Sequence, residues 1–262
     1  MNRLENFDLM RDLAISAARE AGKILMEKLG KIRRDLKSKR EMVTQADTAA
    51  EKKICELIRR EFPEHSILAE ESYKEERHSS YKWIIDPLDG TNNYTYGYPF
   101  FCVSIALEYD GKIILGIVYD PLRDELFEAE LNNTALLNGR KIRVSNTVRL
   151  ADSRLLTGFP YVMEGNPENN LDNFATFALN ACEVRVDGSA ALDLCYVACG
   201  RADGYWELGL KPWDTAAGKL MVECAGGKVT NLKGTTFDYY KDNVLVTNGI
   251  IHSQMIELLE RS

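Results

Sequence analysis

The chain has 262 residues, of which 45% are hydrophobic and 28% are charged, and its formal net charge is −7. This length is sufficient for one large domain, or two modest ones, with a substantial buried core. The acidic balance argues against nucleic acid as a partner, because phosphate backbones select basic protein surfaces.

The sequence contains neither a leader pattern nor a membrane segment. Residues 1–22 lack the basic stretch and continuous apolar core of a signal peptide. The longest apolar runs, such as 100–103 and 113–115, are too short to cross a bilayer. The six cysteines form no CxxC pair and show no metal-ligand spacing. We therefore expect small buried thiols in a reducing environment, and a cytoplasmic protein with no membrane partner.

Two helices and a series of strands are predicted for the first half. Apolar residues recur at helical spacing over 7–29 and 44–62, and Pro63 ends the second helix. The polar, locally basic stretch 31–41 between them is interpreted as a solvated linker. The period then changes, and strands are expected at 66–69, 81–85, 100–109, 112–119 and 125–130. Asp110-Gly111 and Asn138-Gly139 indicate turns.

The second half alternates between strands and helices. Strands are expected at 155–157, 182–186, 203–207, 228–231 and 243–247. Helices are expected at 171–180, 190–199, 214–224 and 250–259. An α+β part, 1–150, is thus followed by a layered α/β part, 151–262, with no long linker or low-complexity tract between them. The sequence shows no internal repeat. We predict two subdomains joined in one compact unit of helix and sheet layers.

Several acidic residues lie at the ends of predicted elements, beside apolar runs. They are Asp47, Glu70, Glu71, Asp86, Asp89 and Asp214. Each has a structural alternative: Asp47 and Asp214 could cap helices, Glu70-Glu71 could be surface charge, and Asp86 to Gly90 could form a tight turn. A simple turn, however, does not need two aspartates directly after a buried strand. Taken together, the set is best explained as hard oxygen ligands for Mg²⁺ at the carboxyl ends of strands.

The residues after Asp89 suggest phosphate chemistry. Gly90 allows the backbone to approach a ligand closely, and free N–H groups at a turn bind phosphate oxygens. Thr91 supplies a hydroxyl group beside the carboxylates. Two carboxylates, a glycine and a hydroxyl together predict a site for metal-assisted phosphate chemistry.

At this point the sequence resembles the inositol monophosphatases, within the lithium-sensitive, Mg²⁺-dependent phosphomonoesterase superfamily. The segments that carry the resemblance are VTQAD (43–47), AEES (69–72), WIIDPLDGTNNY (83–94), DGSAALDL (187–194) and KPWDTAAGKLMVECAGG (211–227). They span most of the chain in the family's order. The resemblance implies an αβαβα sandwich of the sugar-phosphatase type, lithium inhibition and a homodimer.

The resemblance also implies the metal ligands. Glu70, Asp86 and the Leu88 carbonyl would hold a first Mg²⁺, and Asp86, Asp89 and Asp214 a second. A third Mg²⁺, with mostly water ligands, is expected near Glu70, which gives two or three ions per site. Glu70 is chosen over Glu71 by its match to the family. Strand alternation points the two side chains apart but does not say which faces the site.

By the same resemblance, Thr91 and Asp47 orient and deprotonate the attacking water, beside Glu70. The N–H groups of Gly90 and Thr91 hold the phosphate, next to the ligands Asp86, Leu88, Asp89 and Asp214. One metal would lower the pKa of the water and the other would stabilise the leaving alkoxide.

The polyol side of the substrate would be bound by residues of the second half. Glu207 resembles a residue that hydrogen-bonds sugar hydroxyls, and Gly188, Ser189 and Ala190 resemble the loop that lines the pocket. Arg185 matches a substrate-contacting position, although it could also be an ordinary exposed strand arginine.

The predicted substrate is a small phosphate monoester, with inositol-1-phosphate first. A fructose-1,6-bisphosphatase or a broader sugar-phosphate phosphatase is the close alternative. A regulatory protein that binds a phosphorylated ligand without turnover is disfavoured, because such a protein has no use for the water-activating pair Asp47 and Thr91. The four ligand carboxylates would repel a phosphate, so metal is expected to bind before or together with the substrate.

Overall fold

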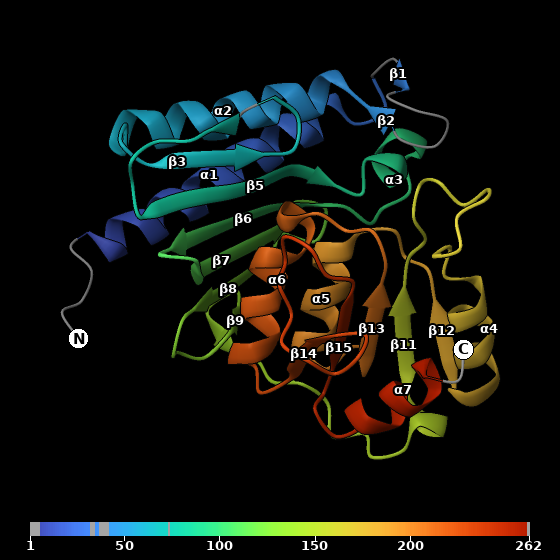
Figure 1. Ribbon diagram of the computed structural model, residues 1–262. Coiled ribbons are helices and arrows are strands. Elements are labelled where there is room, and N and C mark those ends of the chain that lie inside the picture. The colour runs from blue at the N-terminus through green and yellow to red at the C-terminus, as the bar shows by residue number, and fades with distance from the viewer. Residues whose placement is uncertain (1–5, 32–34, 37–41, 73, 261–262) are drawn as a thin grey trace.

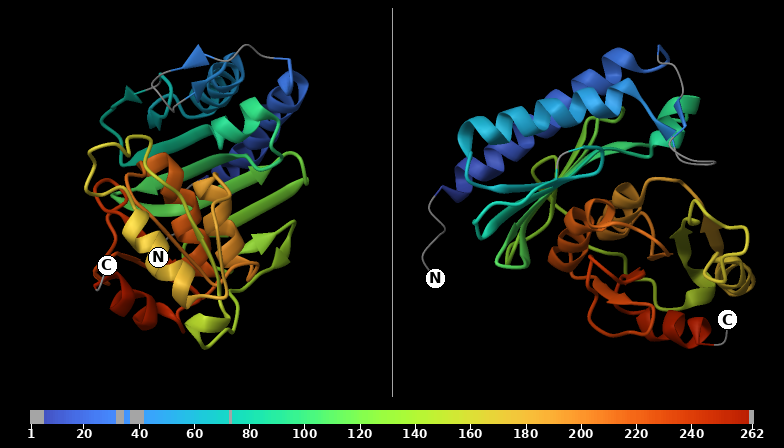
Figure 2. Two further views of the ribbon diagram at one scale, coloured as in Figure 1. Left: turned by 90° about the vertical axis from the view of Figure 1, so that its right-hand side faces the viewer. Right: turned by 45° about the horizontal axis from the view of Figure 1, so that its top comes forward.

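The computed structural model describes residues 6–31, 35–36, 42–72 and 74–260. Helices and sheets alternate in five layers, as predicted (Figure 1). Helices α1 (Phe7–Lys28) and α2 (Gln45–Glu61) cover one face of a large sheet, and the second half of the chain lies on its other face (Figure 2). Within that half, α5 (Ala190–Ala198) and α6 (Pro212–Cys224) separate the large sheet from a smaller one. Helices α4 (Leu171–Asn180) and α7 (His252–Leu259) form the fifth layer.

The large sheet has the strand order β10-β9-β8-β7-β6-β5-β3-β4. In chain order its strands are β3 (Ser66–Ala69), β4 (Lys74–Glu75), β5 (Tyr81–Asp89), β6 (Cys102–Tyr109), β7 (Lys112–Asp120), β8 (Glu125–Glu130), β9 (Leu136–Leu137) and β10 (Arg140–Lys141). Of these pairings only β3 with β5 is parallel, with Ala69 opposite Ile85. The carboxyl end of β3 therefore lies beside Ile85, the residue before Asp86.

Both faces of β5 are buried. Trp83 and Ile85 pack into the core beneath α1 and α2, whereas Ile84 belongs to the core that contains α5 and α6. This alternation is the period of two expected of a strand. A strand covered on both faces is a rigid support for the residues at its end.

The smaller sheet has the order β12-β11-β13-β15-β14. Its strands are β11 (Arg154–Thr157), β12 (Glu183–Arg185), β13 (Gly204–Glu207), β14 (Lys228–Asn231) and β15 (Val244–Thr247). Glycines let the middle helices pack closely, since a Cβ on Gly116 would lie 2.7 Å from the Ala217 carbonyl oxygen and one on Gly218 would lie 2.5 Å from Leu194. The middle layer is therefore held tightly between the two sheets.

The structure differs from the predicted elements mainly at short segments. Strand β5 continues to Asp89 instead of ending at Ile85, because a register shift against β6 between Asp86 and Asp89 accommodates the extra residues as a bulge. The helix α3 (Thr91–Tyr96) that follows was not predicted, since TNNYTY has no helical apolar period. The two-residue strands were also missed.

Two regions of the sequence prediction remain open. Most of the predicted linker 31–41 lies outside the described residues, although β1 (Asp35–Leu36) pairs with β2 (Met42–Val43). The proposed division near residue 150 stays a prediction; the large sheet comes from residues 66–141 and the smaller one from 154–247. No helix in the described part of the chain is long and apolar enough to cross a membrane.

Candidate metal centre and active site

Three aspartates from distant parts of the sequence meet at the end of β5. Asp86 and Asp89 lie in the last residues of that strand, and Asp214 is the third residue of α6. One carboxylate oxygen from each lies within 4.8 Å of the other two. Asp86 and Asp89 are buried, with exposed fractions of 2% and 8%. Among the described residues, this is the only such group of three or more potential metal-ligating side chains.

Hydrogen bonds orient each aspartate. Asp86 Oδ1 accepts from the Leu88 N–H at 2.9 Å, and Asp214 Oδ2 accepts from the Lys211 N–H at 2.6 Å. Asp89 Oδ2 accepts from the Ser189 hydroxyl at 2.5 Å and from the Ala191 N–H at 2.8 Å. These bonds occupy one oxygen of each carboxylate. The helix-cap alternative for Asp214 is therefore compatible with a second role, because capping uses only one of its oxygens.

The electrostatics of this trio favour a bound cation. Burial raises the pKa of Asp86 well above its usual range, and the negative charges of Glu70, Asp89 and Asp214 raise it further. Burial and the charge of Asp89 likewise raise the pKa of Asp214 to about 8. Closely spaced carboxylates remain ionised together only if a cation offsets their repulsion. An all-oxygen donor set is the kind that Mg²⁺ prefers, so the residues present fit this ion.

Glu70 follows β3 and lies beside the trio without being a member of it. Its N–H donates to the Ile85 carbonyl at 3.2 Å, which continues the pairing of β3 with β5. Its charge acts on Asp86, as the pKa of that residue indicates. The next residue, Glu71, donates its N–H to Glu51 on α2. The structure therefore places the backbone of Glu70 beside Ile85, the residue before Asp86.

Asp47 and Thr91 form the predicted pair. Asp47 is buried at the start of α2, where it completes a capping box with Thr44, whose hydroxyl donates to Asp47 Oδ2 at 2.5 Å. The other oxygen, Oδ1, lies 3.1 Å from Thr91 Oγ1, which also lies 2.9 Å from the Leu88 carbonyl oxygen. Burial raises the pKa of Asp47. Asp47 thus both caps a helix and faces Thr91.

Gly90 and Asn93 connect the two halves of the chain at this site. Gly90 has a φ of 91°, and a Cβ there would lie 2.9 Å from the Phe100 carbonyl oxygen and 3.3 Å from that of Gly188. The Asn93 side-chain amide donates to the carbonyls of Phe100 and Asp187, both at 2.8 Å. The loop before α5 is therefore fixed against the start of α3, although sequence reasoning gave Asn93 no role.

Glu207 lies at the end of β13 and is held by a neighbour. Tyr205 donates its hydroxyl to Glu207 Oε2 at 2.6 Å, and burial raises the pKa of Glu207 to about 7. A Cβ on Gly158 would overlap both carboxylate oxygens of Glu207. Glycine at this position therefore leaves the space that the Glu207 carboxylate uses, a contact that no sequence motif indicated.

Arg185 is the predicted residue that the structure ties least closely to the site. It lies on β12, at the edge of the smaller sheet, and pairs with Glu183 at 2.5 Å. Half of its side chain is exposed. Its role in substrate binding stays a prediction.

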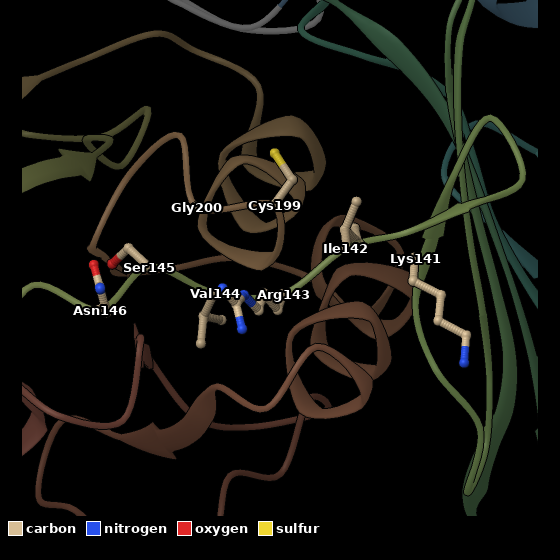
Figure 3. A pocket seen from close by; sticks show the side chains of 8 residues that line it. All are labelled: Lys141, Ile142, Arg143, Val144, Ser145, Asn146, Cys199 and Gly200. Atoms are coloured by element: carbon tan, nitrogen blue, oxygen red, sulfur yellow. The ribbon is translucent and has the colours of Figure 1, made fainter.

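A separate surface pocket of about 640 Å³ is lined by none of these carboxylates (Figure 3). Its lining residues are Lys141, Ile142, Arg143, Val144, Ser145, Asn146, Cys199 and Gly200. Burial raises the pKa of the Cys199 thiol, so this group is neutral and weakly nucleophilic at neutral pH. The Lys141 and Cys199 side chains point in different directions (Figure 3). The lining contains no acidic side chain that could bind a cation, so the aspartate trio remains the candidate metal centre.

Comparison with known proteins agrees with this geometry. Residues 7–262 match the model of the inositol monophosphatase family. The chain is 45% identical over 231 residues to a protein of Pasteurella multocida named Nus factor SuhB, covering 86% of each. It is 42% identical over 251 residues to an inositol-1-monophosphatase of Synechocystis, covering 95% of this chain and 88% of the relative. An inositol monophosphatase structure from Anabaena superposes with a TM-score of 0.89 at 44% identity, covering 98% of this chain and 97% of the other.

Proposed function

The chain belongs to the inositol monophosphatase family, and on that premise we propose that it is a Mg²⁺-dependent phosphomonoesterase that hydrolyses inositol-1-phosphate to inositol and phosphate. The observation that carries the proposal is the convergence of three aspartates on one space, next to a buried Asp47–Thr91 pair. A metal site alone would suit many proteins. A threonine hydroxyl paired with a buried carboxylate at its edge adds a group that can take the proton of an attacking water, which the hydrolysis of a phosphate ester uses.

Glu70, Asp86, the Leu88 carbonyl, Asp89 and Asp214 are the groups that would hold two or three Mg²⁺ ions. Bound Mg²⁺ supplies Lewis acidity, which lowers the pKa of a water and offsets the negative charge of the phosphate. The protein contributes the fixed positions of the ligands, because each aspartate is oriented by hydrogen bonds to the backbone.

Thr91 and Asp47 would then move the proton of the attacking water. The Thr91 hydroxyl has one proton and two acceptors in reach, Asp47 Oδ1 and the Leu88 carbonyl. When the hydroxyl donates to Asp47, its oxygen can accept a proton from the water. The water oxygen forms its bond to phosphorus as the ester P–O bond breaks, and the leaving inositol oxygen takes a proton from solvent. The raised pKa of Asp47 makes it a stronger base for this step.

Phosphate would be held by the N–H groups of Gly90 and Thr91 and the ligands around them, as the family resemblance implies. Glu207, fixed by Tyr205, supports the polyol assignment, because a carboxylate is a suitable acceptor for vicinal hydroxyls. Gly188, Ser189 and Ala190 complete this side, although the Ser189 hydroxyl is already engaged with Asp89.

A substrate panel tests the proposal. Phosphate release is measured with Mg²⁺ for inositol-1-phosphate, fructose-1,6-bisphosphate and a simple aryl phosphate, in the wild type and in Glu207→Gln. We expect the highest kcat/KM for inositol-1-phosphate, and a loss in Glu207→Gln that is larger for this ester than for the aryl phosphate. Preference for fructose-1,6-bisphosphate would favour the sugar-phosphatase alternative. No release from any monoester would refute the enzyme proposal.

Three further properties are proposed, two from the family resemblance and one from the cysteines. Millimolar lithium should inhibit turnover, and an unchanged rate would count against this. The protein should form a homodimer, which light scattering after gel filtration measures directly. A cytoplasmic location is supported by the six cysteines, all of which are free in the structure, and cell fractionation tests it.

A further inference from the structure

Glu51 is a buried acidic residue that neither the family motifs nor the proposed chemistry uses. It lies on α2, one turn after Asp47, and only 1% of it is exposed. Its carboxylate accepts three hydrogen bonds from the segment that follows Glu70. Oε2 accepts from the Glu71 N–H at 2.7 Å, and Oε1 accepts from the Ser72 N–H at 2.9 Å and the Ser72 hydroxyl at 2.6 Å.

Such a set of bonds fixes a backbone strongly. Hydrogen bonds to an ionised acceptor are shorter and stronger than neutral ones, and burial increases their strength further. Two of the three donors are main-chain amides, so the bonds determine the direction of the chain and not only of one side chain. The segment at 71–72 is thereby attached to α2.

Glu70 lies between two segments of backbone that are held by hydrogen bonds. On one side its own N–H donates to the Ile85 carbonyl, next to Asp86. On the other side the amides of Glu71 and Ser72 are turned toward Glu51. Because both amides donate to one carboxylate, the chain bends at 70–72 instead of continuing as a strand. This bend is held to α2, while the charge of Glu70 acts on Asp86.

We propose that Glu51 is a positioning residue for the metal centre: by holding the 71–72 segment against α2, it directs the Glu70 carboxylate toward Asp86. The inference rests on the proposed function, in which Glu70 is a ligand. Helix α2 then serves the site twice, because Asp47 at its first turn faces Thr91 and Glu51 at its second turn holds the ligand loop.

The test compares Glu51→Gln with Glu56→Gln. The glutamine introduced by Glu51→Gln has nearly the same volume as the native side chain, but it replaces one acceptor oxygen by an NH₂ group, which cannot accept from the donors it would face. Glu56 lies on the same helix, with a side chain that is 58% exposed and 3.8 Å from Lys52, so its substitution removes the same charge at a distance from the loop. Mg²⁺ alone is titrated into EDTA-stripped protein by calorimetry, without substrate.

We expect Glu51→Gln to weaken Mg²⁺ binding by about 10- to 100-fold, the range found when groups that orient metal ligands are removed. Amide hydrogen exchange at 70–72 should become faster, and half-maximal activity should require correspondingly more Mg²⁺. At saturating Mg²⁺ the KM for inositol-1-phosphate should return close to the wild-type value. Glu56→Gln should resemble the wild type throughout. Wild-type affinity and wild-type exchange in Glu51→Gln would overturn the positioning role.

A milder variant covers the case in which Glu51→Gln does not fold. Ser72→Ala removes only the hydroxyl bond and leaves both amide bonds, so it should weaken Mg²⁺ binding by a few-fold without changing the circular dichroism. If Glu51→Gln does not fold and Ser72→Ala binds Mg²⁺ as tightly as the wild type, this result would count against the proposal. If the wild-type protein itself binds no Mg²⁺, the proposed function fails; if the wild type binds and Glu51→Gln binds equally, only the positioning role fails.

Discussion

Replacing Asp214 by asparagine should stabilise the protein in EDTA and destabilise it, relative to the wild type, in Mg²⁺. The reason is that Asp214 is a third carboxylate in a space shared with Asp86 and Asp89. The asparagine side chain would keep an oxygen to accept the Lys211 N–H, so the start of α6 would remain capped. The substitution therefore removes the charge with little change to the helix.

The size of the stability change follows from the pKa of Asp214. Burial and neighbouring carboxylates raise the pKa of Asp214 from 3.8 to about 8. At roughly 1.4 kcal/mol per pH unit, this corresponds to at most about 6 kcal/mol. Because Asp214 is partly exposed and three carboxylates share the protons, we expect on the order of 2 kcal/mol, or roughly 4 to 8 °C in Tm.

The effect of Asp214→Asn on stability depends on pH. Between pH 3.8 and about 8, folded Asp214 keeps a proton that the unfolded chain has released, so the stability of the metal-free protein falls as pH rises through this range. The advantage of Asp214→Asn in EDTA should therefore be absent near pH 4 and largest at pH 8. Mg²⁺ at 100 times its Kd stabilises a binding-competent protein by about 2.7 kcal/mol, which is enough to reverse the order.

The assay is thermal unfolding by circular dichroism at pH 6 and pH 8, in EDTA and in Mg²⁺. Asp172→Asn is the control, because Asp172 is an exposed acidic residue in the first turn of another helix, α4. It should show neither the pH-dependent gain nor the Mg²⁺-dependent reversal. If Asp214→Asn is less stable than the wild type in EDTA at pH 8, then the trio is not a repulsive, metal-requiring cluster and the reasoning is wrong.

Four further substitutions test other parts of the site and fold. Thr91→Ala and Asp47→Asn should each lower kcat by about 10²- to 10⁴-fold with little change in KM. Because the pair acts as a unit, kcat of the double variant should be no lower than that of the slower single variant. Steady-state kinetics in which the two losses of kcat multiply would contradict this. Gly158→Ala should displace Glu207 and raise the KM for inositol-1-phosphate about 10-fold, without altering the Mg²⁺ requirement; an unchanged KM would show that the contact is unimportant. His252 is buried, and burial lowers its pKa to about 4. The free energy of unfolding should therefore fall by up to ~3 kcal/mol as pH drops from 6.5 to 4. In urea unfolding, His252→Gln should not show this contribution to the fall.

Periodicity predicted the long elements because their burial is regular. The helices α1 and α2 each bury one repeating set of side chains, whereas the strands from β5 to β7 are buried on both faces and stand out as apolar runs bounded by turn residues. A single sequence shows both patterns. The bulge between Asp86 and Asp89 and the six-residue helix α3 show no repeating apolar pattern. The shape of the bulge comes from pairing with β6, and α3 starts after Gly90, which has a left-handed conformation. The strand order of the two sheets depends on contacts between distant segments and was not predictable in this way.

The candidate site was predictable to the extent that its residues stand at the ends of elements. Asp86, Asp89 and Asp214 could be selected from the sequence because carboxylates beside apolar runs need a partner, and the structure brings them together. Glu51 could not be selected. On the sequence it is one more acidic residue on a helix, and only the packing of α2 against the loop after β3 shows what its carboxylate accepts.

The dependence of phosphate release on free Mg²⁺ tests the central claim most directly, in the wild type and in Asp89→Asn with inositol-1-phosphate as substrate. We predict no release in EDTA, saturable activation by Mg²⁺ in the wild type, and a rate at least about 100-fold lower in Asp89→Asn at the same Mg²⁺ concentration. Release that persists in EDTA, or an Asp89→Asn variant as active as the wild type, would contradict the account.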